Sequence, residues 1–369
     1  MKKLVIILLA LCLLLASCEN DGNVSETDIS KVPENSEISD TSLPEQSEIS
    51  EESEESVYIP VNLFEKTETV KEGKLEYNFN SSAAEFEFQN LVTFMETLYS
   101  TGNKFVYPTD EKYMLEGYTG RAADTFSFVY IDLETGCQMG YNTAAIYQTC
   151  SVIKPSLAVY MLKNGFDLSE EITITYYSGG SGVLKSTDVG KSFTAEYLME
   201  IMITESDNTA YRHLLKKYDQ QAFSDYLASI GNKNTNVGAP TWYKYGLISA
   251  PDLAVMMQDI YAYSVESEKG AWVLECMQRA TYNELITSVD GGIPVGHKYG
   301  EDNTIEPSLH DGAIYVGEHP YILVILSKSE VKETESYEKF KAITILVNEF
   351  HAAMHGGADI FTPESEVTR

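Results

Sequence analysis

A serine and a lysine three residues apart, Ser151 and Lys154, are the residues of this chain best suited to nucleophilic chemistry. A serine hydroxyl is a weak nucleophile at its ordinary pKa and needs an adjacent base. In a helical turn, three-residue spacing places both side chains on one face. Lysine can act as the base when burial lowers the pKa of its ammonium group. The pair is therefore a candidate for covalent catalysis.

Ser-x-x-Lys is a short pattern, and this chain contains it three times. The copies at 329–332 and 336–339 lie in or beside a charged run that is typical of a solvated surface. The copy that begins at Ser151 is flanked by apolar residues over 146–162, which would carry it into the protein interior. The alternative for this copy is a buried helix start without chemistry.

Two further motifs follow in order, Ser-Asp-Asn at 206–208 and Lys-Tyr-Gly at 298–300. Ser-Asp-Asn occurs once. Lys-Tyr-Gly also occurs at 244–246, but only the copy at 298–300 follows a strand-like run and precedes two more strands. We take the later copy as the functional one.

Together the three motifs resemble the S-x-x-K, S-D-N and K-T-G signature of penicillin-recognising serine enzymes, most closely that of the class A β-lactamase family. The likeness extends from about 124 to 350. It implies an α+β fold of the β-lactamase/transpeptidase type. In that fold an antiparallel sheet is built from both chain ends, is flanked by helices, and carries an inserted helical lobe.

The resemblance also implies four catalytic roles. Ser151 would attack a carbonyl and form an acyl-enzyme, and Lys154 would accept its proton directly or through water. Ser206 would relay a proton to the leaving nitrogen. Lys298 would supply positive charge for the carboxylate of the substrate.

The substrate-binding residues that the resemblance implies are Asn208, Tyr299, Gly300 and Glu301. Asn208 would hold the substrate or the catalytic lysine. The backbone N–H of Glu301, with that of the nucleophile, would form an oxyanion hole, whose donors are each worth about 10²–10³ in rate. Asp207 is expected to be a buried structural carboxylate.

The sequence departs from the class A pattern in the loop that follows the Ser-Asp-Asn motif. That loop carries a glutamate which activates the deacylating water. Between the motif and Asp252 this chain has two acids, Asp219 and Asp225, both in a helical context. We therefore expect acylation with slow hydrolysis. Tyr299 is expected to crowd the carboxylate pocket, and Glu301 with Asp302 to disfavour an anionic substrate.

The leading hypothesis is a β-lactamase-like serine hydrolase that acts on β-lactams or D-Ala-D-Ala-type amides, with no cofactor, as a monomer. One alternative is a penicillin-binding, DD-peptidase-like enzyme that deacylates slowly. A second is a non-catalytic envelope-binding module on the same fold.

The N-terminus predicts export. Residues 1–17 combine two lysines, an apolar run too short to span a membrane, and small residues before Cys18,. This resembles a bacterial lipoprotein signal, in which Cys18 receives a lipid. Residues 19–57 carry thirteen acids and one lysine, so 18–57 is expected to be a disordered tether. The protein is then extracytoplasmic and anchored to the cell membrane.

The folded part is predicted at 58–369, with a sheet lobe at 58–150 and 285–369 and a helical lobe at 151–284. Of the formal net charge of −30, −20 remains here, which argues against nucleic acid as a partner. Three cysteines remain, allowing at most one disulfide,. Cys150 is interpreted as a small buried residue rather than a rival nucleophile.

Hydrophobic periodicity predicts the elements of this part. Helices are expected at 83–100, 151–162, 193–204, 209–218, from Pro251 onward, and at 337–354. Strands are expected at 125–131, 137–141, 292–300, 310–316 and 321–326. Pro155 disfavours α-helical backbone at Lys154, which leaves the local geometry of the Ser-Lys pair open.

A metal site was also considered at the end of the chain. His351 and His355 lie four apart on the last predicted helix and could share a face,. No third ligand lies near them in the sequence, so none is predicted.

Overall fold

The computed structural model describes residues 75–79, 84–100, 126–237, 246–289, 291–303, 307–329 and 334–356. The predicted signal, Cys18 and the acidic tether lie outside these residues. Within the described ranges, no helix combines the length and the apolar character that a membrane span requires.

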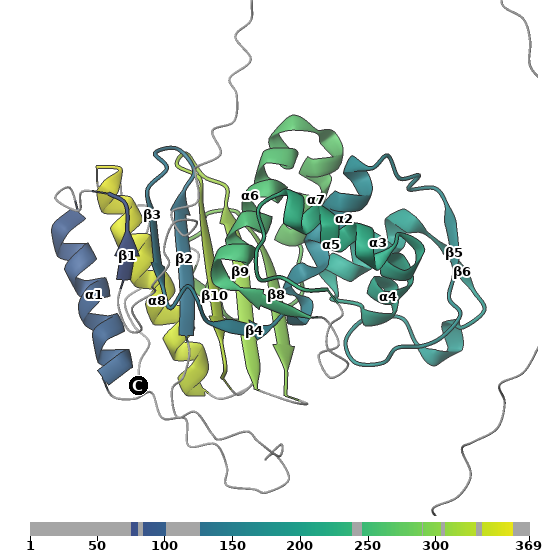
Figure 1. Cartoon of the computed structure of the whole chain (residues 1–369), viewed down its shortest axis with the longest axis horizontal. Helices are drawn as coiled ribbons and strands as arrows, with labels where there is room; N and C mark the ends of the chain where they lie inside the picture. The colour runs from purple at the N-terminus through teal and green to yellow at the C-terminus, as the bar shows by residue number, and fades with distance from the viewer. Residues whose placement is uncertain are drawn as a thin grey trace, which may run out of the picture. The chain divides into compact units, whose positions relative to one another are not determined.

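A six-stranded antiparallel sheet in the order β1-β3-β2-β10-β9-β8 forms the centre of the fold (Figure 1). Its strands are β1 (Leu75–Tyr77), β2 (Phe126–Asp132), β3 (Gln138–Tyr141), β8 (Val295–Asp302), β9 (Ser308–Tyr315) and β10 (Tyr321–Ser327). Strands β2 and β10 pair over seven residues, from Phe126 opposite Ser327 to Asp132 opposite Tyr321. This pairing joins the two ends of the chain, so the predicted α+β fold class is confirmed.

Helices cover both faces of this sheet (Figure 1). Helices α1 (Glu85–Ser100) and α8 (Thr334–Met354) lie on one side and the helical lobe on the other. Because successive strand residues point to opposite faces, β10 contributes to two cores. Leu323 and Ile325 pack with Phe340 and Phe350 of α8. The alternate residues Ile322, Val324 and Leu326 pack with the helical lobe.

The helical lobe and the segments around it contain six α-helices and two small sheets among the described residues. The helices are α2 (Lys154–Lys163), α3 (Ala195–Thr204), α4 (Asn208–Lys217), α5 (Gln220–Ser229), α6 (Ala250–Glu266) and α7 (Glu268–Gln278). Short 3₁₀ turns occur at η4 (Cys150–Ile153), η5 (Ser186–Asp188) and η6 (Ile286–Val289). The small sheets pair β4 (Ile146–Gln148) with β7 (Leu247–Ser249), and β5 (Glu171–Thr173) with β6 (Ser192–Thr194).

One difference from the predicted elements lies at the start of α3. The helix predicted from Phe193 begins at Ala195, because Phe193 pairs with Ile172 in a two-stranded sheet. Thr194 then caps the helix, and its hydroxyl accepts the N–H of Tyr197 at 3.2 Å. Three-residue strands are too short for the alternation that would identify them in the sequence.

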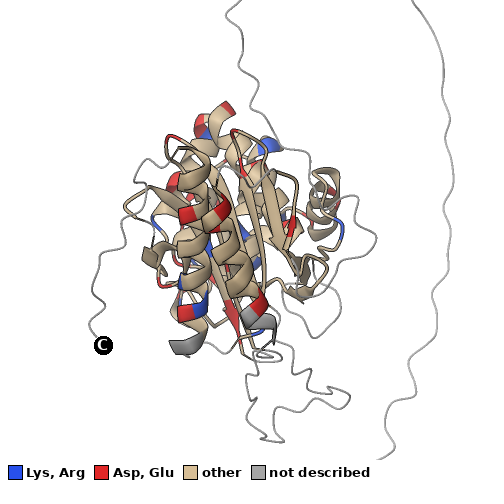
Figure 2. Ribbon diagram, turned by 90° about the vertical axis from the view of Figure 1, so that its left-hand side faces the viewer, with Lys and Arg blue, Asp and Glu red and all other residues tan. Residues whose placement is uncertain are grey.

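Acidic positions outnumber basic ones along the face that carries α1 and α8 (Figure 2). A nucleic-acid surface requires clustered lysine and arginine. This face therefore has the wrong charge for phosphate binding, in line with the net charge of the chain.

Candidate active site

Ser151 and Lys154 lie in one continuous helical segment. Ser151 belongs to η4, and Lys154 opens α2 and donates its backbone N–H to the carbonyl oxygen of Ser151. Lys154 keeps helical backbone angles, φ −59° and ψ −44°, although Pro155 follows it. Proline is tolerated in the first turn of a helix, where its missing N–H has no partner to lose. The proline therefore does not displace the predicted pair.

The residue before the nucleophile has an uncommon backbone conformation. Cys150 has a φ of +48°, in the left-handed region that non-glycine residues rarely occupy. Such strain persists only where the surroundings fix it. Here His310 Nε2 lies 2.8 Å from the carbonyl oxygen of Gln148, and the N–H of Thr149 donates to Gly246 at 3.0 Å. Cys150 is buried, as predicted, and free of disulfides.

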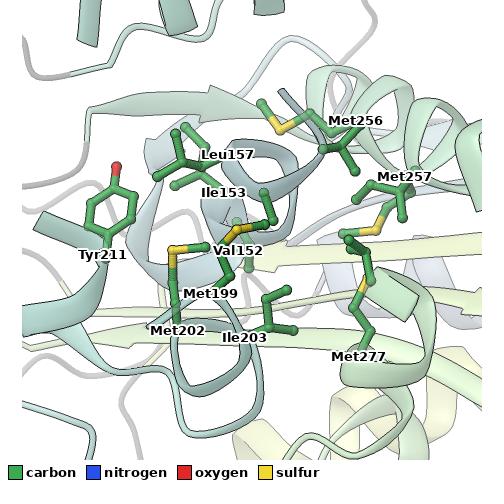
Figure 3. Close-up of a cluster of buried hydrophobic side chains, with 14 of the residues drawn as sticks. Val152, Ile153, Leu157, Met199, Met202, Ile203, Tyr211, Met256, Met257 and Met277 are labelled. Atoms are coloured by element: carbon green, nitrogen blue, oxygen red, sulfur yellow. The ribbon is translucent and has the colours of Figure 1, made fainter. Parts of the chain in front are cut away.

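The core of the helical lobe packs against the same turn. Val152 and Ile153 are fully buried and lie among Met199, Ile203 and Met277 (Figure 3). A close-packed interior resists displacement of its members. The position of the Ser151 backbone is therefore set by packing on one side and by strand β8 on the other.

Lys154 has no solvent-exposed surface. Its Nζ donates to the carbonyl oxygen of Ser206 at 2.6 Å, and lies 3.1 Å from Ser206 Oγ and 2.9 Å from Asn208 Oδ1. Burial, and then the positive charge of Lys298, lower the pKa of Lys154 well below its ordinary value,. A neutral amine donates two hydrogen bonds and keeps one lone pair, so it can accept a proton from a serine hydroxyl.

The Ser-Asp-Asn motif is held in place by its middle residue. Asp207, which is buried as predicted, caps α4 by accepting the N–H of Ala210 at 2.8 Å. Its other oxygen accepts the N–H of Leu184 at 2.8 Å. Ser206 has a φ of +54°, and this conformation turns its carbonyl towards both Lys154 Nζ and Ser181 Oγ, the latter 2.9 Å away.

A glycine-rich loop packs against this motif at distances that exclude side chains. A Cβ at Gly182, where φ is +120°, would lie 2.5 Å from the Cα of Asp207, and one at Gly180 would lie 2.5 Å from Asn208 Nδ2. Glycine is thus required here both for conformation and for space.

We expect Gly182→Ala to destabilise the protein by on the order of 3 kcal/mol, because backbone atoms of Asp207 would have to move. Gly179→Ala is the matched control: its φ of +71° is also left-handed, but its nearest neighbour would be 3.8 Å away. It is expected to cost only about 1–2 kcal/mol. Urea unfolding of both variants measures the difference, and equal losses would show that contact with Asp207 is unimportant.

Lys298 lies on the edge strand β8 and is almost completely buried. Its Nζ donates to the carbonyl oxygen of Tyr299 at 2.9 Å. Burial lowers its pKa to about 7, although the carboxylate of Asp311 acts in the opposite direction. Gly300 follows on the same face, where a Cβ would lie 2.9 Å from the backbone nitrogen of Ser151. Strand β8 thus runs directly against the backbone of Ser151.

The structure differs from the sequence-based expectation at Tyr299. Because strand residues alternate, its ring points to the face opposite Lys298 and packs in the core beside Leu285 and Ile286. It stacks on Tyr282, with ring centroids 5.5 Å apart, and its hydroxyl donates to the Glu301 carboxylate. The prediction that the ring crowds the substrate side is therefore wrong, and the Glu301 carboxylate is engaged by a neighbour.

The acids that follow the Ser-Asp-Asn motif are occupied elsewhere. Asp219 caps α5 by accepting the N–H of Gln221 at 2.9 Å, and Asp225 accepts the side-chain amide of the same glutamine. Asp252 accepts the N–H groups of Lys233 and Asn234 at 2.9 Å each. In the described part of this region, no carboxylate takes the place of the family's deacylating glutamate; residues 238–245 lie outside it.

His310 is a positioning residue that sequence reasoning missed. Burial lowers the pKa of its imidazole to about 4, so the ring is neutral. Its Nε2 lies 2.8 Å from the carbonyl oxygen of Gln148, and its Nδ1 lies 3.2 Å from the backbone nitrogen of Ser327 and 2.8 Å from the carbonyl oxygen of Leu309. The ring links β9 and β10 to the strand before the nucleophile. Strand alternation alone could not distinguish it from other buried residues.

Comparison with known proteins supports this fold. A profile of the beta-lactamase enzyme family matches residues 111–350, well over half of the 369-residue chain. No curated protein sequence matches. Among solved structures, a mutant of PBP-A, as its acyl-enzyme complex with penicillin G, is similar with a TM-score of 0.58 and 19% identity over 70% of this chain and 95% of that one.

Two β-lactamase structures are also similar. The enzyme from Sphaerobacter thermophilus DSM 20745 has a TM-score of 0.53 and 20% identity, over 61% of this chain and 90% of that one. An ancestral (GNCA) class A β-lactamase has a TM-score of 0.53 and 19% identity, over 60% and 93%. At these identities the likeness concerns the fold, and the family match covers residues 111–350. This chain therefore belongs to the beta-lactamase enzyme family.

Proposed function

We propose that this protein is a serine acyl-transfer enzyme in which Ser151 forms an acyl-enzyme with β-lactams or D-Ala-D-Ala-type amides. The observation that carries the proposal is the fully buried Lys154, whose lowered pKa suits a base and whose amine is held by Ser206 and Asn208. Membership of the beta-lactamase family supports a serine hydrolase. The penicillin G complex of PBP-A supports a small β-lactam as the ligand.

The acylation step then follows from these positions. Ser151 Oγ attacks the carbonyl carbon while its proton passes to Lys154, directly or through water. The N–H groups of Ser151 and Glu301 stabilise the oxyanion. As the C–N bond breaks, the proton returns from Lys154 through the hydroxyl of Ser206, 3.1 Å from the amine, to the leaving nitrogen. Lys298 in its charged form attracts the carboxylate of the substrate.

Release of the acyl group is expected to be slow. Hydrolysis needs a base that activates a water molecule for attack on the ester carbonyl. Family members of class A use a glutamate as this base. The acids that follow the Ser-Asp-Asn motif are hydrogen-bonded to nearby groups. Asp219 and Asp252 accept backbone N–H groups, and Asp225 accepts a side-chain amide. Among the possible roles, the penicillin-binding type with a long-lived acyl-enzyme is therefore favoured over a fast β-lactamase.

The proposal includes a location. We propose that Cys18 is lipidated and that 18–57 tethers a monomeric domain outside the cell membrane. Labelling of cells with a radioactive fatty acid tests this, because Cys18→Ala should abolish the label. Label retained in that variant would refute lipidation at Cys18.

The decisive experiment is the intact mass of the purified protein after incubation with a penicillin. We expect a stable increase by the mass of the drug, which disappears in the Ser151→Ala variant. Rapid consumption of the drug without an adduct would instead indicate β-lactamase turnover. Neither adduct nor consumption would refute acyl transfer on β-lactams and favour a binding module.

A further inference from the structure

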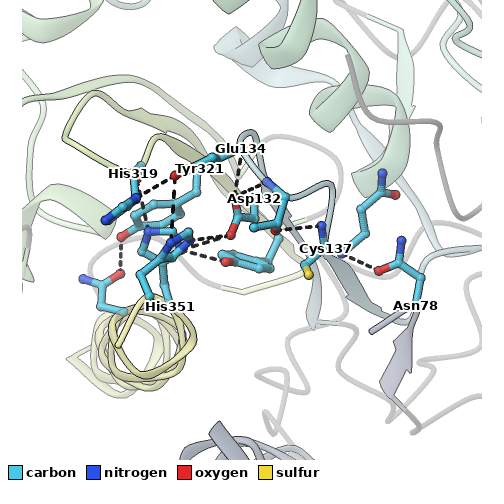
Figure 4. A network of polar contacts seen from close by, with 12 residues as sticks. Asn78, Asp132, Glu134, Cys137, His319, Tyr321 and His351 are labelled. Carbon is cyan, nitrogen blue, oxygen red and sulfur yellow. Dashed lines mark hydrogen bonds and ion pairs between the residues drawn. The ribbon is translucent and has the colours of Figure 1, made fainter. Parts of the chain in front are cut away.

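Three of the six histidines in the chain gather with two carboxylates where the end of β2 meets the last turns of α8 (Figure 4). The cluster consists of Asp132, Glu134, His319, His351 and His355. None of these residues has a role in the proposed acyl transfer. His351 and His355 have no third ligand near them in the sequence, but the fold brings one, Asp132, from 223 positions away.

The ligand atoms of Asp132, His351 and His355 all lie within 4.8 Å of one another. His355 Nε2 is 2.7 Å from Asp132 Oδ2, and His351 Nδ1 is 4.0 Å from the same oxygen. All three side chains are buried. Two histidines one helical turn apart and one carboxylate form a set that suits Zn²⁺, with room for a further ligand such as water.

A second trio, Glu134, His319 and His355, also has clustered ligand atoms, but its rings are oriented unfavourably. A metal ion must lie near the plane of each imidazole that binds it. His319 and His355 are stacked, with centroids 4.0 Å apart and planes at 16°, so their lone pairs cannot converge. The planes of His351 and His355 meet at 52°. The first trio is therefore the better site.

Surrounding hydrogen bonds orient the ligands of the first trio. Asp132 Oδ1 accepts the N–H groups of Glu134 and Thr135 at 2.9 and 3.1 Å, which aims Oδ2 at the histidines. His351 Nε2 lies 3.1 Å from the carbonyl oxygen of His319. A carbonyl can only accept, so Nε2 carries the proton and Nδ1 presents its lone pair. Ligating histidines commonly have such a partner on the other nitrogen.

The other two contacts also fit a bound ion. His355 Nδ1 lies 3.9 Å from Glu134 Oε2, which His319 Nδ1 contacts at 2.6 Å, so this carboxylate attracts a proton on His355 Nδ1 electrostatically while Nε2 binds the metal. Tyr130 OH lies 2.7 Å from His351 Nδ1 and also hydrogen-bonds Asp132. Its hydroxyl can remain on the carboxylate when an ion takes the histidine lone pair.

We propose that Asp132 Oδ2, His351 Nδ1 and His355 Nε2 bind one Zn²⁺-type divalent transition-metal ion. At bond lengths of about 2.0–2.1 Å, tetrahedral ligand atoms lie about 3.3 Å apart, so His355 and Asp132 separate slightly and His351 moves closer. One carboxylate offsets half of the charge of the ion. The ion joins the end of β2 to the end of α8, and binding therefore stabilises the folded state.

The test uses the full-length protein, titrated with CoCl₂ and then with ZnCl₂. We expect one Co²⁺ per chain with the intense visible absorption of a four-coordinate site, displaced by Zn²⁺ and unaffected by Mg²⁺. Zn²⁺ should raise the melting temperature and EDTA should reverse the rise. No Co²⁺ absorption and no Zn²⁺-dependent shift would overturn the proposal.

Variants locate the site. Asp132→Asn and His355→Ala should abolish the absorption, whereas His319→Ala should retain it, because the His319 side chain contacts Glu134 and is not a ligand in the proposed set. Glu134→Gln should weaken binding by about 10- to 100-fold. Loss in His319→Ala with retention in Asp132→Asn would refute the proposed ligand set. Circular dichroism shows whether each variant is folded, and Cys137→Ser excludes binding through a thiol.

Acylation of Ser151 provides an independent readout. The Ser151→Ala variant should bind Co²⁺ as the unmodified protein does. Failure of the metal titration therefore leaves the acyl-transfer proposal untouched, and failure of acylation leaves the metal site untouched.

Discussion

Replacing Lys154 by methionine is expected to slow acylation of Ser151 by about 10²–10⁴-fold, the usual contribution of a positioned base. Methionine is of similar length and apolar, so it fills the buried site but cannot accept the serine proton. Ser206 and Asn208 would lose the amine that they contact at 2.6 and 2.9 Å. The rate of adduct formation with a penicillin, followed by intact mass, measures the effect.

Lys163→Met is the matched control. Lys163 lies at the end of the same helix, is partly exposed, and pairs with Asp259 at 2.6 Å. Replacing it is expected to leave acylation unchanged, because an exposed ion pair contributes little to the stability of the protein. An acylation rate in Lys154→Met within a few-fold of the unmodified protein would show that another group takes the proton.

Much of the fold could be predicted because its long elements are regular. Helices such as α6 and α8 place apolar residues at helical spacing, and Leu253, Met256, Phe340 and Val347 are all buried as the pattern indicates. The strands that form the sheet are seven or eight residues long, apart from the short ones at the edge near α1. Short pairings such as β5 with β6 depend on distant contacts and leave no such pattern.

The candidate site was predictable where chemistry fixes residue type and order. The contact of Lys154 with Asn208 follows the expected role of Asn208. The direction of the Tyr299 ring was not predictable, because it depends on which face of β8 meets Ser151. The positive φ of Cys150 and the partner of His351 and His355 depend on residues far away in sequence. A pattern of spacing cannot contain such information.

Stability should rise with pH from about 7 towards 10 because of Lys298. The pKa of its amine is about 7 in the folded protein and near 10.4 in an unfolded chain. In this range the unfolded chain binds a proton that the folded protein does not hold. The free energy of unfolding therefore rises with pH, by up to about 1.4 kcal/mol per pH unit from this group. Below pH 7 both states are protonated, and the folded state bears the full penalty of a buried charge.

Lys298→Met should therefore be more stable than the unmodified protein at pH 6, by on the order of 4 kcal/mol at most. The gain should shrink as the pH approaches 10, and urea unfolding at several pH values measures it. Lys191→Met is the control, since this exposed lysine pairs with Asp188 at the surface and should show no such pH dependence. The gain in stability of Lys298→Met over the unmodified protein should be larger at pH 6 than at pH 10. An equal gain at both pH values would contradict a lowered pKa of Lys298. If the variant gains stability and loses acylation, the buried charge of Lys298 lowers the stability of the fold and is required for substrate recognition.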